Sequence, residues 1–274
     1  MTRSVSENGK VLITGATSGL GLRLANHFLE KGYDVVATGR KNITLNGYGE
    51  RFILLKTDFS NMARTAEAVK KICRDHQFDI VINNAGILSP PDFKLTDDGF
   101  EYTFQVNFLS HFMLNEIIIR NAEPGRPLMI ASTVSPVYRI AEKNLAVYTS
   151  KSGYSPIKAY SNSKLYLALM CSYLHSKYPE AELRCIGFDP GTFSSEIYRM
   201  QNKWFRKMYR IAAPFMRSPE KVASRFGEVL KREDLADGAV YRSRKGRGRL
   251  PVAETNAVRI FWKECEKIIE PYVS

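Results

Sequence analysis

The sequence predicts a doubly wound α/β fold, in which helices cover both faces of a parallel β-sheet. Short runs rich in Val, Ile and Leu alternate with longer segments of helical length. The short runs are apolar almost throughout, as strands buried on both faces are. A glycine-rich turn follows the first run, at the place where such sheets bind ligands. No linker or repeat divides the 274 residues, so we expect one domain over residues 1–274.

The elements alternate regularly along the chain. Six segments have the composition of buried strands, namely residues 10–14, 34–39, 51–58, 78–83, 126–132 and 183–189. Between most of them lie four helical segments, residues 20–31, 61–76, 99–121 and 156–177. This alternation is typical of a parallel sheet with right-handed crossovers. Because ligands bind beyond the carboxyl ends of such strands, functional residues are expected just after each strand.

The turn after the first strand reads TGATSGLG, residues 14–21. Gly15, Gly19 and Gly21 allow a tight turn and a close approach to a phosphate, and the next helix offers unpaired N–H groups. The spacing is G-x-x-x-G-x-G, not the usual G-x-G-x-x-G. The alternative is a glycine-rich turn without a ligand. We predict a dinucleotide site that also includes Thr17, Ser18 and Leu20.

The end of the second strand indicates which dinucleotide binds. An acid there would hold a ribose hydroxyl, whereas an arginine would accept a 2′-phosphate. The sequence has Arg40 and Lys41 at this end and no acid. Asp34 opens the strand, about 16 Å away at about 3.3 Å per residue. We therefore predict NADP(H) over NAD(H), with Arg40 on the phosphate; the alternative is a solvated arginine.

Six motifs identify a family when they are taken in order. They are TGATSGLG, NNAG (83–86), Asn107 in QVNFLSHF, Ser132 ending LMIAS, Tyr160 with Lys164 in AYSNSK, and DPGT (189–192). Together they resemble the short-chain dehydrogenase/reductase family over nearly the whole chain. The branch that looks most similar contains retinol dehydrogenases and the WW-domain oxidoreductase. The features behind this choice are the long segment between Ser132 and Tyr160 and residues 214–223 and 258–268.

The resemblance implies a catalytic set. Tyr160 would exchange a proton with the substrate oxygen, Ser132 would donate a hydrogen bond to that oxygen, and Asn107 would hold the arrangement behind Lys164. Lys164 lies one helical turn from Tyr160, on the same face. A unit charge about 4 Å away is worth roughly 4 kcal/mol at an effective dielectric of about 20, or about 3 pKa units toward tyrosinate. The sequence thus predicts a proton donor tuned by its neighbouring cation.

The resemblance also implies further cofactor contacts. Asp58 and Phe59 follow the third strand, and Asp58 resembles the acid that contacts the adenine. Residues 84–86 (Asn84, Ala85 and Gly86) resemble the segment that lines the adenine ribose and stabilises the sheet. The remaining predicted contacts, near the nicotinamide, are Tyr160, Lys164, Pro190, Gly191 and Thr192; in the family the lysine hydrogen-bonds the nicotinamide ribose.

The net charge of +12 is concentrated in two segments. Residues 199–217 carry six Lys/Arg and residues 242–249 carry five, and neither has an acid. In a helix, 199–213 would separate Trp, Met and Phe from the cations. The family places a substrate loop at about 192–220, so this segment is a lid, a membrane-surface helix or a partner-binding helix. Residues 242–249 lack interleaved aromatic residues, which disfavours nucleic acid.

We therefore expect an NADP(H)-dependent oxidoreductase that interconverts a carbonyl and an alcohol on a hydrophobic substrate, retinoid, steroid-like or lipid-like. The alternative is a non-catalytic cofactor-binding sensor on the same fold. Scattered cysteines and histidines predict no metal site and a reducing compartment. The N-terminus has no apolar signal, so the expected location is cytoplasmic, with peripheral membrane contact through 199–217 left open. Pairing of two copies is also left open.

Overall fold

The strands of the computed structural model follow the buried apolar runs. The structure describes residues 9–141, 145–147, 149–191, 193, 216–242, 246, 248 and 255–274. Within these ranges, seven parallel strands form one sheet in the order β3-β2-β1-β4-β5-β6-β7. The strands are β1 (Lys10–Ile13), β2 (Asp34–Gly39), β3 (Phe52–Lys56), β4 (Ile80–Asn83), β5 (Leu128–Thr133), β6 (Leu183–Phe188) and β7 (Val240–Tyr241). The order reverses between β1 and β4, which confirms the predicted doubly wound class.

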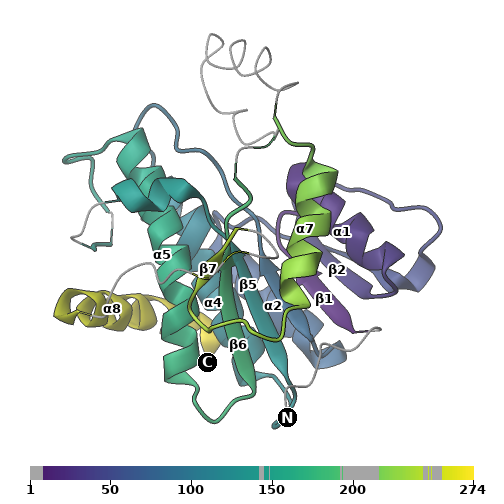
Figure 1. The fold of residues 1–274 in the computed structure, drawn as a ribbon. Coiled ribbons are helices and arrows are strands. Elements are labelled where there is room, and N and C mark those ends of the chain that lie inside the picture. The colour runs from purple at the N-terminus through teal and green to yellow at the C-terminus, as the bar shows by residue number, and fades with distance from the viewer. Residues whose placement is uncertain are drawn as a thin grey trace.

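Helices cover both faces of the sheet (Figure 1). On one face, α1 (Gly19–Glu30) packs against α7 (Pro219–Leu230). On the other face lie α2 (Met62–Asp75), α4 (Ser110–Arg120) and α5 (Pro156–Lys177), with α8 (Asn256–Val273) packed on α2 and α4. Short elements complete the described chain: the 3₁₀ turns η1 (Gly49–Arg51) and η3 (Pro136–Ile140), α3 (Tyr102–Phe104) and the π-turn η2 (Gln105–Leu109).

Local sequence explains how these helices are placed. In α1, Leu20, Leu24 and Phe28 recur every fourth residue and are buried against the sheet. The helix α2 begins where the Asn61 side chain accepts a hydrogen bond from the Arg64 N–H. The helix α5 begins with Pro156, whose missing N–H costs nothing in the first turn. The sequence therefore sets both the buried faces and the starting points of these helices.

The segment predicted as one helix over 99–121 is divided into α3, η2 and α4. The π-turn η2 contains Asn107, whose side chain is buried and bonded to residue 87. An extra residue in a helical turn changes the direction of the side chains near it, and such bulges are common at functional sites. The helical periodicity of the sequence does not predict this π-turn.

Four elements of the described chain lie wholly outside the predicted ranges: η3, β7, α7 and α8. β7 is only two residues long and pairs with Gly187 and Phe188 of β6, so it is too short to show a pattern. The helix α8 buries Phe261 and Trp262 in an aromatic cluster with Phe108 of η2. Because Phe108 is distant from these residues in the sequence, sequence patterns do not predict this packing.

The predicted substrate loop lies mostly outside the described residues, and so does the membrane-binding or lid helix expected in 199–217. The two described ends of the loop meet, because Phe193 and Arg217 form an isolated parallel bridge. Among the residues that the structure describes, no helix is both long enough and apolar enough to span a bilayer.

Candidate functional site

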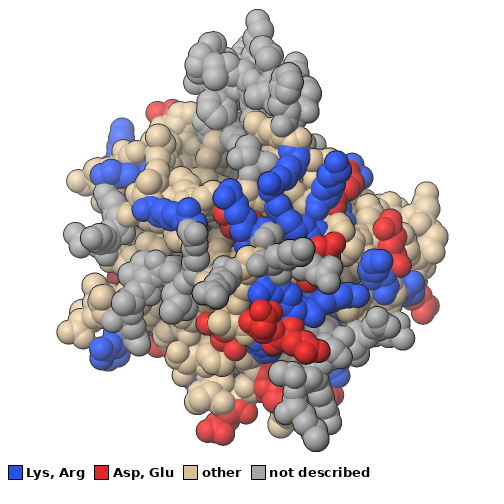
Figure 2. Space-filling model, viewed as in Figure 1, with Lys and Arg blue, Asp and Glu red and all other residues tan. Residues whose placement is uncertain are grey.

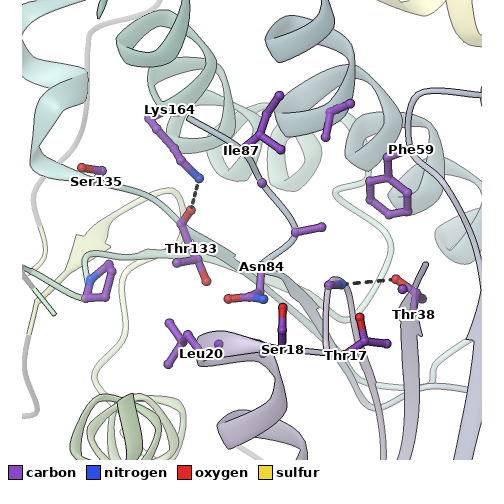
Figure 3. A pocket seen from close by; sticks show the side chains of 18 of the residues that line it. Thr17, Ser18, Leu20, Thr38, Phe59, Asn84, Ile87, Thr133, Ser135 and Lys164 are labelled. Carbon is purple, nitrogen blue, oxygen red and sulfur yellow. Dashed lines mark hydrogen bonds between the residues drawn. The ribbon is translucent and has the colours of Figure 1, made fainter. Parts of the chain in front are cut away.

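A cleft of about 320 Å³ opens at the carboxyl ends of the strands. Nearly all the residues predicted to bind a cofactor line it, from β1 to β6. They are Gly15, Thr17, Ser18, Gly19, Leu20, Gly21, Arg40, Lys41, Asp58, Phe59, Asn84, Ala85, Gly86, Tyr160, Lys164, Pro190 and Gly191. Thr192, the remaining one, lies outside the described residues. Figure 3 shows the glycine turn on one side of the cleft and Lys164 on the other.

The three glycines of the turn have different roles. Gly15 has φ of +66°, and a Cβ there would lie 2.7 Å from the Ala85 Cα. A Cβ on Gly21 would lie 2.4 Å from the Gly15 carbonyl oxygen. Gly19 has φ of +56° and open space around its missing Cβ. The first two glycines therefore close the packing between β1, β4 and α1, and the third leaves room for a ligand.

The amino end of α1 is free to hold an anion. Ser18 occupies the N-cap position, but its side chain makes no capping hydrogen bond, and the first turn contains no acid. The first N–H groups of a helix carry a partial positive charge and have no partner within the helix. Together with the space beside Gly19, this arrangement fits the diphosphate of a dinucleotide cofactor.

We predict that Gly19→Ala weakens dinucleotide binding about tenfold or more, because the new methyl group enters the space left for the ligand. Gly49→Ala is the matched control, since Gly49 has φ of +52°, open surroundings and no place in the cleft. Both variants should lose about 1 kcal/mol of stability from the strained backbone. Calorimetric titration with NADP⁺ and NAD⁺ measures the difference; equal affinities in the two variants would contradict it.

The end of β2 presents the predicted cations to the cleft. Arg40 and Lys41 are exposed and line it, and the Arg40 Nη1 lies 3.9 Å from the Asp58 Oδ2. Asp34 lies at the other end of the strand, 3.5 Å from Arg51 and 4.0 Å from Lys10. The acid of β2 is therefore paired away from the cleft, as its position in the strand predicts.

A buried network holds the NNAG segment against β1, and the sequence did not indicate its central residue, Thr14. The Thr14 Oγ1 accepts hydrogen bonds from the N–H groups of Asn84 (2.8 Å) and Ala85 (2.9 Å) and lies 2.9 Å from the His111 Nε2. The His111 Nδ1 lies 3.0 Å from the Asn107 carbonyl oxygen, which only accepts, so the ring proton is on Nδ1. Burial, mainly, lowers the pKa of His111 to about 3, so the ring is neutral.

Asn107 connects this network to α5. Its Oδ1 accepts from the Ile87 N–H (2.8 Å), and its Nδ2 donates to the Ile87 carbonyl (3.0 Å) and to the Ser163 Oγ (3.0 Å). A Cβ on Gly86 would lie 3.3 Å from the Asn107 Oδ1 and 3.6 Å from the Lys164 Nζ. Asn107 thus lies behind Lys164 and fixes the backbone beside it, without lining the cleft itself.

Lys164 is a buried cation on α5. Its Nζ donates a 3.1 Å hydrogen bond to the Thr133 carbonyl oxygen (Figure 3). The Nζ also lies 5.9 Å from the centre of the Tyr160 ring. Burial lowers the pKa of Lys164 to about 8. The predicted neighbours on one helical face are therefore together at the cleft, with the ammonium between the tyrosine and the end of β5.

At the end of β5, the residue that lines the cleft is Thr133 and not the predicted Ser132. Ser132 is fully buried, accepts a 3.1 Å hydrogen bond from the Asn83 Nδ2, and does not line the cleft. Thr133 lines it, and its buried Oγ1 has no hydrogen-bond partner among the described residues. Successive strand residues point to opposite faces, so a shift of one residue exchanges core for cleft. We therefore replace Ser132 with Thr133 as the candidate donor.

Tyr138, Tyr154 and Tyr166 lie near Tyr160 in the sequence and are rival candidates for the proton donor, but none of them lines the cleft. The Tyr154 hydroxyl donates to the Pro90 carbonyl at 2.7 Å, and burial raises its pKa. Tyr166 is buried in the aromatic cluster with Phe108, and Tyr138 is buried as well. Tyr148 lies outside the described residues. Tyr102 does line the cleft, although it has no lysine one turn later.

Sequence patterns did not predict several of the residues that line the cleft. They include Thr38, Thr57, Ile87, Tyr102, Val106, Thr133, Val134, Ser135, Pro136 and Phe193. Thr38 is the next-to-last residue of β2, and its Oγ1 accepts a hydrogen bond from the Gly15 N–H at 3.4 Å. His111 was detectable in principle, because it follows Asn107 by four residues in the same helical segment.

Known proteins are similar to this chain in sequence. Polyprenol dehydrogenase from Homo sapiens is 28% identical over 207 residues, which cover 69% of this chain and 62% of that protein. Retinol dehydrogenase 11 from Homo sapiens is 26% identical over 234 residues, covering 81% of this chain and 73% of that protein. Similarity to retinol dehydrogenases confirms the predicted branch.

A solved structure shows the same fold. It is a 3-ketoacyl-(acyl-carrier-protein) reductase from Brucella melitensis complexed with NADH, with a TM-score of 0.65 and 20% identity over 86% of this chain and 96% of that one. The sequence profile of the short chain dehydrogenase family matches residues 9–206, which is most of the chain and includes the glycine turn, Tyr160 and Lys164. The chain belongs to the short chain dehydrogenase family.

Proposed function

We propose that this protein is an NADP(H)-dependent oxidoreductase that interconverts a carbonyl and an alcohol. The observation that carries the proposal is the grouping of Tyr160, Lys164 and the Thr133 hydroxyl at one end of a cleft whose other end is built for a diphosphate. A protein that only bound a cofactor would need the diphosphate end alone. The alternative, a non-catalytic sensor, gives no role to the buried cation or to the Thr133 hydroxyl, which has no hydrogen-bond partner among the described residues.

The chain's own groups account for the proton and the charge in this reaction. When bound, the nicotinamide supplies or accepts the hydride. The Tyr160 hydroxyl gives its proton to the oxygen of a reduced carbonyl, or takes it back in the reverse direction. The Lys164 ammonium stabilises the phenolate that remains. The Thr133 Oγ1 donates a hydrogen bond to the substrate oxygen as negative charge develops there.

Oxidation of NADPH tests the proposal directly. Retinal, steroid ketones and long-chain aliphatic aldehydes form the substrate panel, and absorbance at the nicotinamide band reports turnover. We expect at least one class to be reduced by the natural protein and none by Tyr160→Phe. Binding of NADPH without turnover of any carbonyl would favour the sensor instead.

A hydrophobic substrate is part of the proposal. The relatives are named for retinol and polyprenol, both long apolar alcohols. Apolar side chains also line the cleft of this chain, among them Ile87, Val106, Val134 and Phe193. Contact of residues 199–217 with a membrane surface, a cytoplasmic location and pairing of two copies stay predictions.

The preference for NADP(H) rests on Arg40. We expect Arg40→Asp to raise the KM for NADPH at least tenfold and to lower the KM for NADH, because a carboxylate repels the 2′-phosphate and accepts the ribose hydroxyls. Arg51→Asp is the control, since Arg51 lies at the far end of the β2–β3 pair and not in the cleft. Unchanged KM values for both cofactors in Arg40→Asp would remove Arg40 from the cofactor site.

Substitutions of the adjacent residues Thr133 and Ser132 test which of the two donates the hydrogen bond to the substrate oxygen. Thr133→Ala should lower kcat about 100-fold, the usual effect of removing one donor to a developing oxyanion, and Thr133→Ser should restore most of it. Ser132→Ala should leave kcat within a few-fold and cost about 1 kcal/mol of stability through its bond with Asn83. Steady-state kinetics and chemical denaturation measure both; the reverse ranking of kcat would return the role to Ser132.

A further inference from the structure

Three arginines meet beside Gly191, which lines the cleft just after β6. A Cβ on Gly191 would lie 3.4 Å from the Arg217 Nη1 and 3.5 Å from the Arg242 Nη2, so two guanidinium groups approach one point. The Arg225 Nη2 donates a 2.6 Å hydrogen bond to the Pro190 carbonyl oxygen. Because Pro190 and Gly191 line the cleft, the arginine cluster (Arg217, Arg225 and Arg242) adjoins its wall.

The cluster carries more positive charge than its protein partners neutralise. Asp189 is its acid: the Oδ2 lies 3.5 Å from the Arg242 Nε, while the Oδ1 accepts from the Gly191 N–H. In the part of the chain that the structure describes, no carboxylate forms a salt bridge with Arg217 or Arg225. The Arg225 Nε is buried and has no hydrogen-bond partner there. Among the residues that the structure describes, one carboxylate therefore faces three guanidinium groups.

The pKa of Arg225 reports the same imbalance. Burial lowers it, and the nearby charges of Arg217 and Arg242 lower it further, while Asp189 acts in the opposite direction. Repulsion between like charges raises the free energy of the folded protein. A bound anion would therefore stabilise such a cluster. Phosphate suits arginine in particular, because the planar guanidinium forms two parallel hydrogen bonds to it.

The fold assembles this cluster from separate basic parts of the sequence. Arg217 ends the basic segment 199–217, and Arg242 begins the basic segment 242–249. The bridge between Phe193 and Arg217 and the pairing of β7 with β6 bring them together beside α7, which carries Arg225. Lys and Arg side chains gather in the middle of the face shown in Figure 2, where α7 and β7 lie in Figure 1.

We propose that Arg217, Arg225 and Arg242 form an anion subsite that holds a phosphate group of a ligand bound in the cleft. The inference rests on the proposed function only in taking the cleft as the ligand site. The phosphate has two sources, the diphosphate of the dinucleotide or a phosphate group on the substrate, and both present the same chemistry to the arginines. A phosphorylated substrate would place its charged end here and its apolar part along the cleft.

Binding of inorganic pyrophosphate to the full chain tests the subsite without turnover. Calorimetric titration at low salt should show a binding event that Arg242→Gln and Arg217→Gln each weaken about tenfold or more, the loss of a charge-assisted hydrogen-bond pair. Both side chains are exposed, so the variants should fold, which circular dichroism checks. Lys221→Gln, on the exposed face of α7, is the charge-matched control and should bind as the natural protein does.

Two results would overturn the subsite: pyrophosphate that does not bind, or binding that the arginine variants and Lys221→Gln weaken equally. Saturating NADP⁺ then separates the sources. Pyrophosphate that still binds beside NADP⁺ assigns the site to a substrate phosphate, and pyrophosphate that NADP⁺ displaces assigns it to the cofactor diphosphate. Tyr160→Phe should bind pyrophosphate normally, so loss of turnover and loss of the anion subsite are separate outcomes.

Discussion

Tyr160→Phe should lower kcat by at least ~10²–10⁴-fold while NADPH binds with unchanged affinity. General acid catalysis contributes a factor of this size, and phenylalanine keeps the ring while removing the proton that the substrate oxygen needs. Tyr160 lies near the buried Lys164 ammonium, whereas the rival Tyr154 has its hydroxyl on the Pro90 carbonyl. The prediction therefore concerns one hydroxyl group and not tyrosines in general.

Stopped-flow reduction of an active carbonyl, together with fluorescence titration of NADPH, measures the two quantities separately. Tyr154→Phe is the control, and its kcat should stay within a few-fold of the natural protein. If Tyr160→Phe kept most of its activity, another group would be the proton donor, and Tyr102, which also lines the cleft, would be the next candidate.

Lys164→Met should abolish turnover and yet make the protein more stable. Burial lowers the pKa of Lys164 from 10.5 to about 8, so the fold holds a charged group at neutral pH in a place that disfavours charge. A shift of this size corresponds to about 3 kcal/mol. Loss of the hydrogen bond to the Thr133 carbonyl oxygen reduces this gain by about 1 kcal/mol. A net gain of about 2 kcal/mol in the free energy of unfolding is expected at pH 7.

The contribution of Lys164 to the free energy of unfolding increases with pH. Between pH 8 and 10.5 the unfolded chain keeps the Lys164 proton while the folded chain has lost it, so stability from this group increases as pH rises through that window. Lys164→Met removes the increase. Denaturation with urea at pH 7, 8.5 and 10 measures it. A variant that is less stable than the natural protein at pH 7 would show that burial does not penalise this cation.

Lys177→Met is the matched control on the same helix, with the opposite expected sign. The Lys177 Nζ lies 2.9 Å from the Glu116 carboxylate and 2.6 Å from that of Glu266, and the pKa of Lys177 is raised. Its removal leaves the fully buried Glu116 with less compensation. Lys177→Met should therefore lose stability while activity is retained. The two substitutions separate a cation kept for chemistry from a cation kept for structure.

The sequence by itself determined the class of fold and the local parts of the site. Buried strands are visible as apolar runs, and the glycine turn and the Tyr160–Lys164 pair each lie within a single turn of chain. Contacts over so few residues follow from backbone geometry alone, without knowledge of distant partners. Arg40 and Asp34 could also be placed, since they lie at opposite ends of one short strand.

Only the tertiary structure decided which of two adjacent residues, Ser132 or Thr133, lines the cleft and what surrounds the lysine. Strand parity places Thr133 at the cleft and Ser132 in the core, but the sequence does not state which face of β5 is which. Thr14 and His111 bond to each other across 97 residues. The arginine cluster likewise joins two basic segments that are separate in the sequence. Each depends on strand order, which long-range packing determines and local patterns do not record.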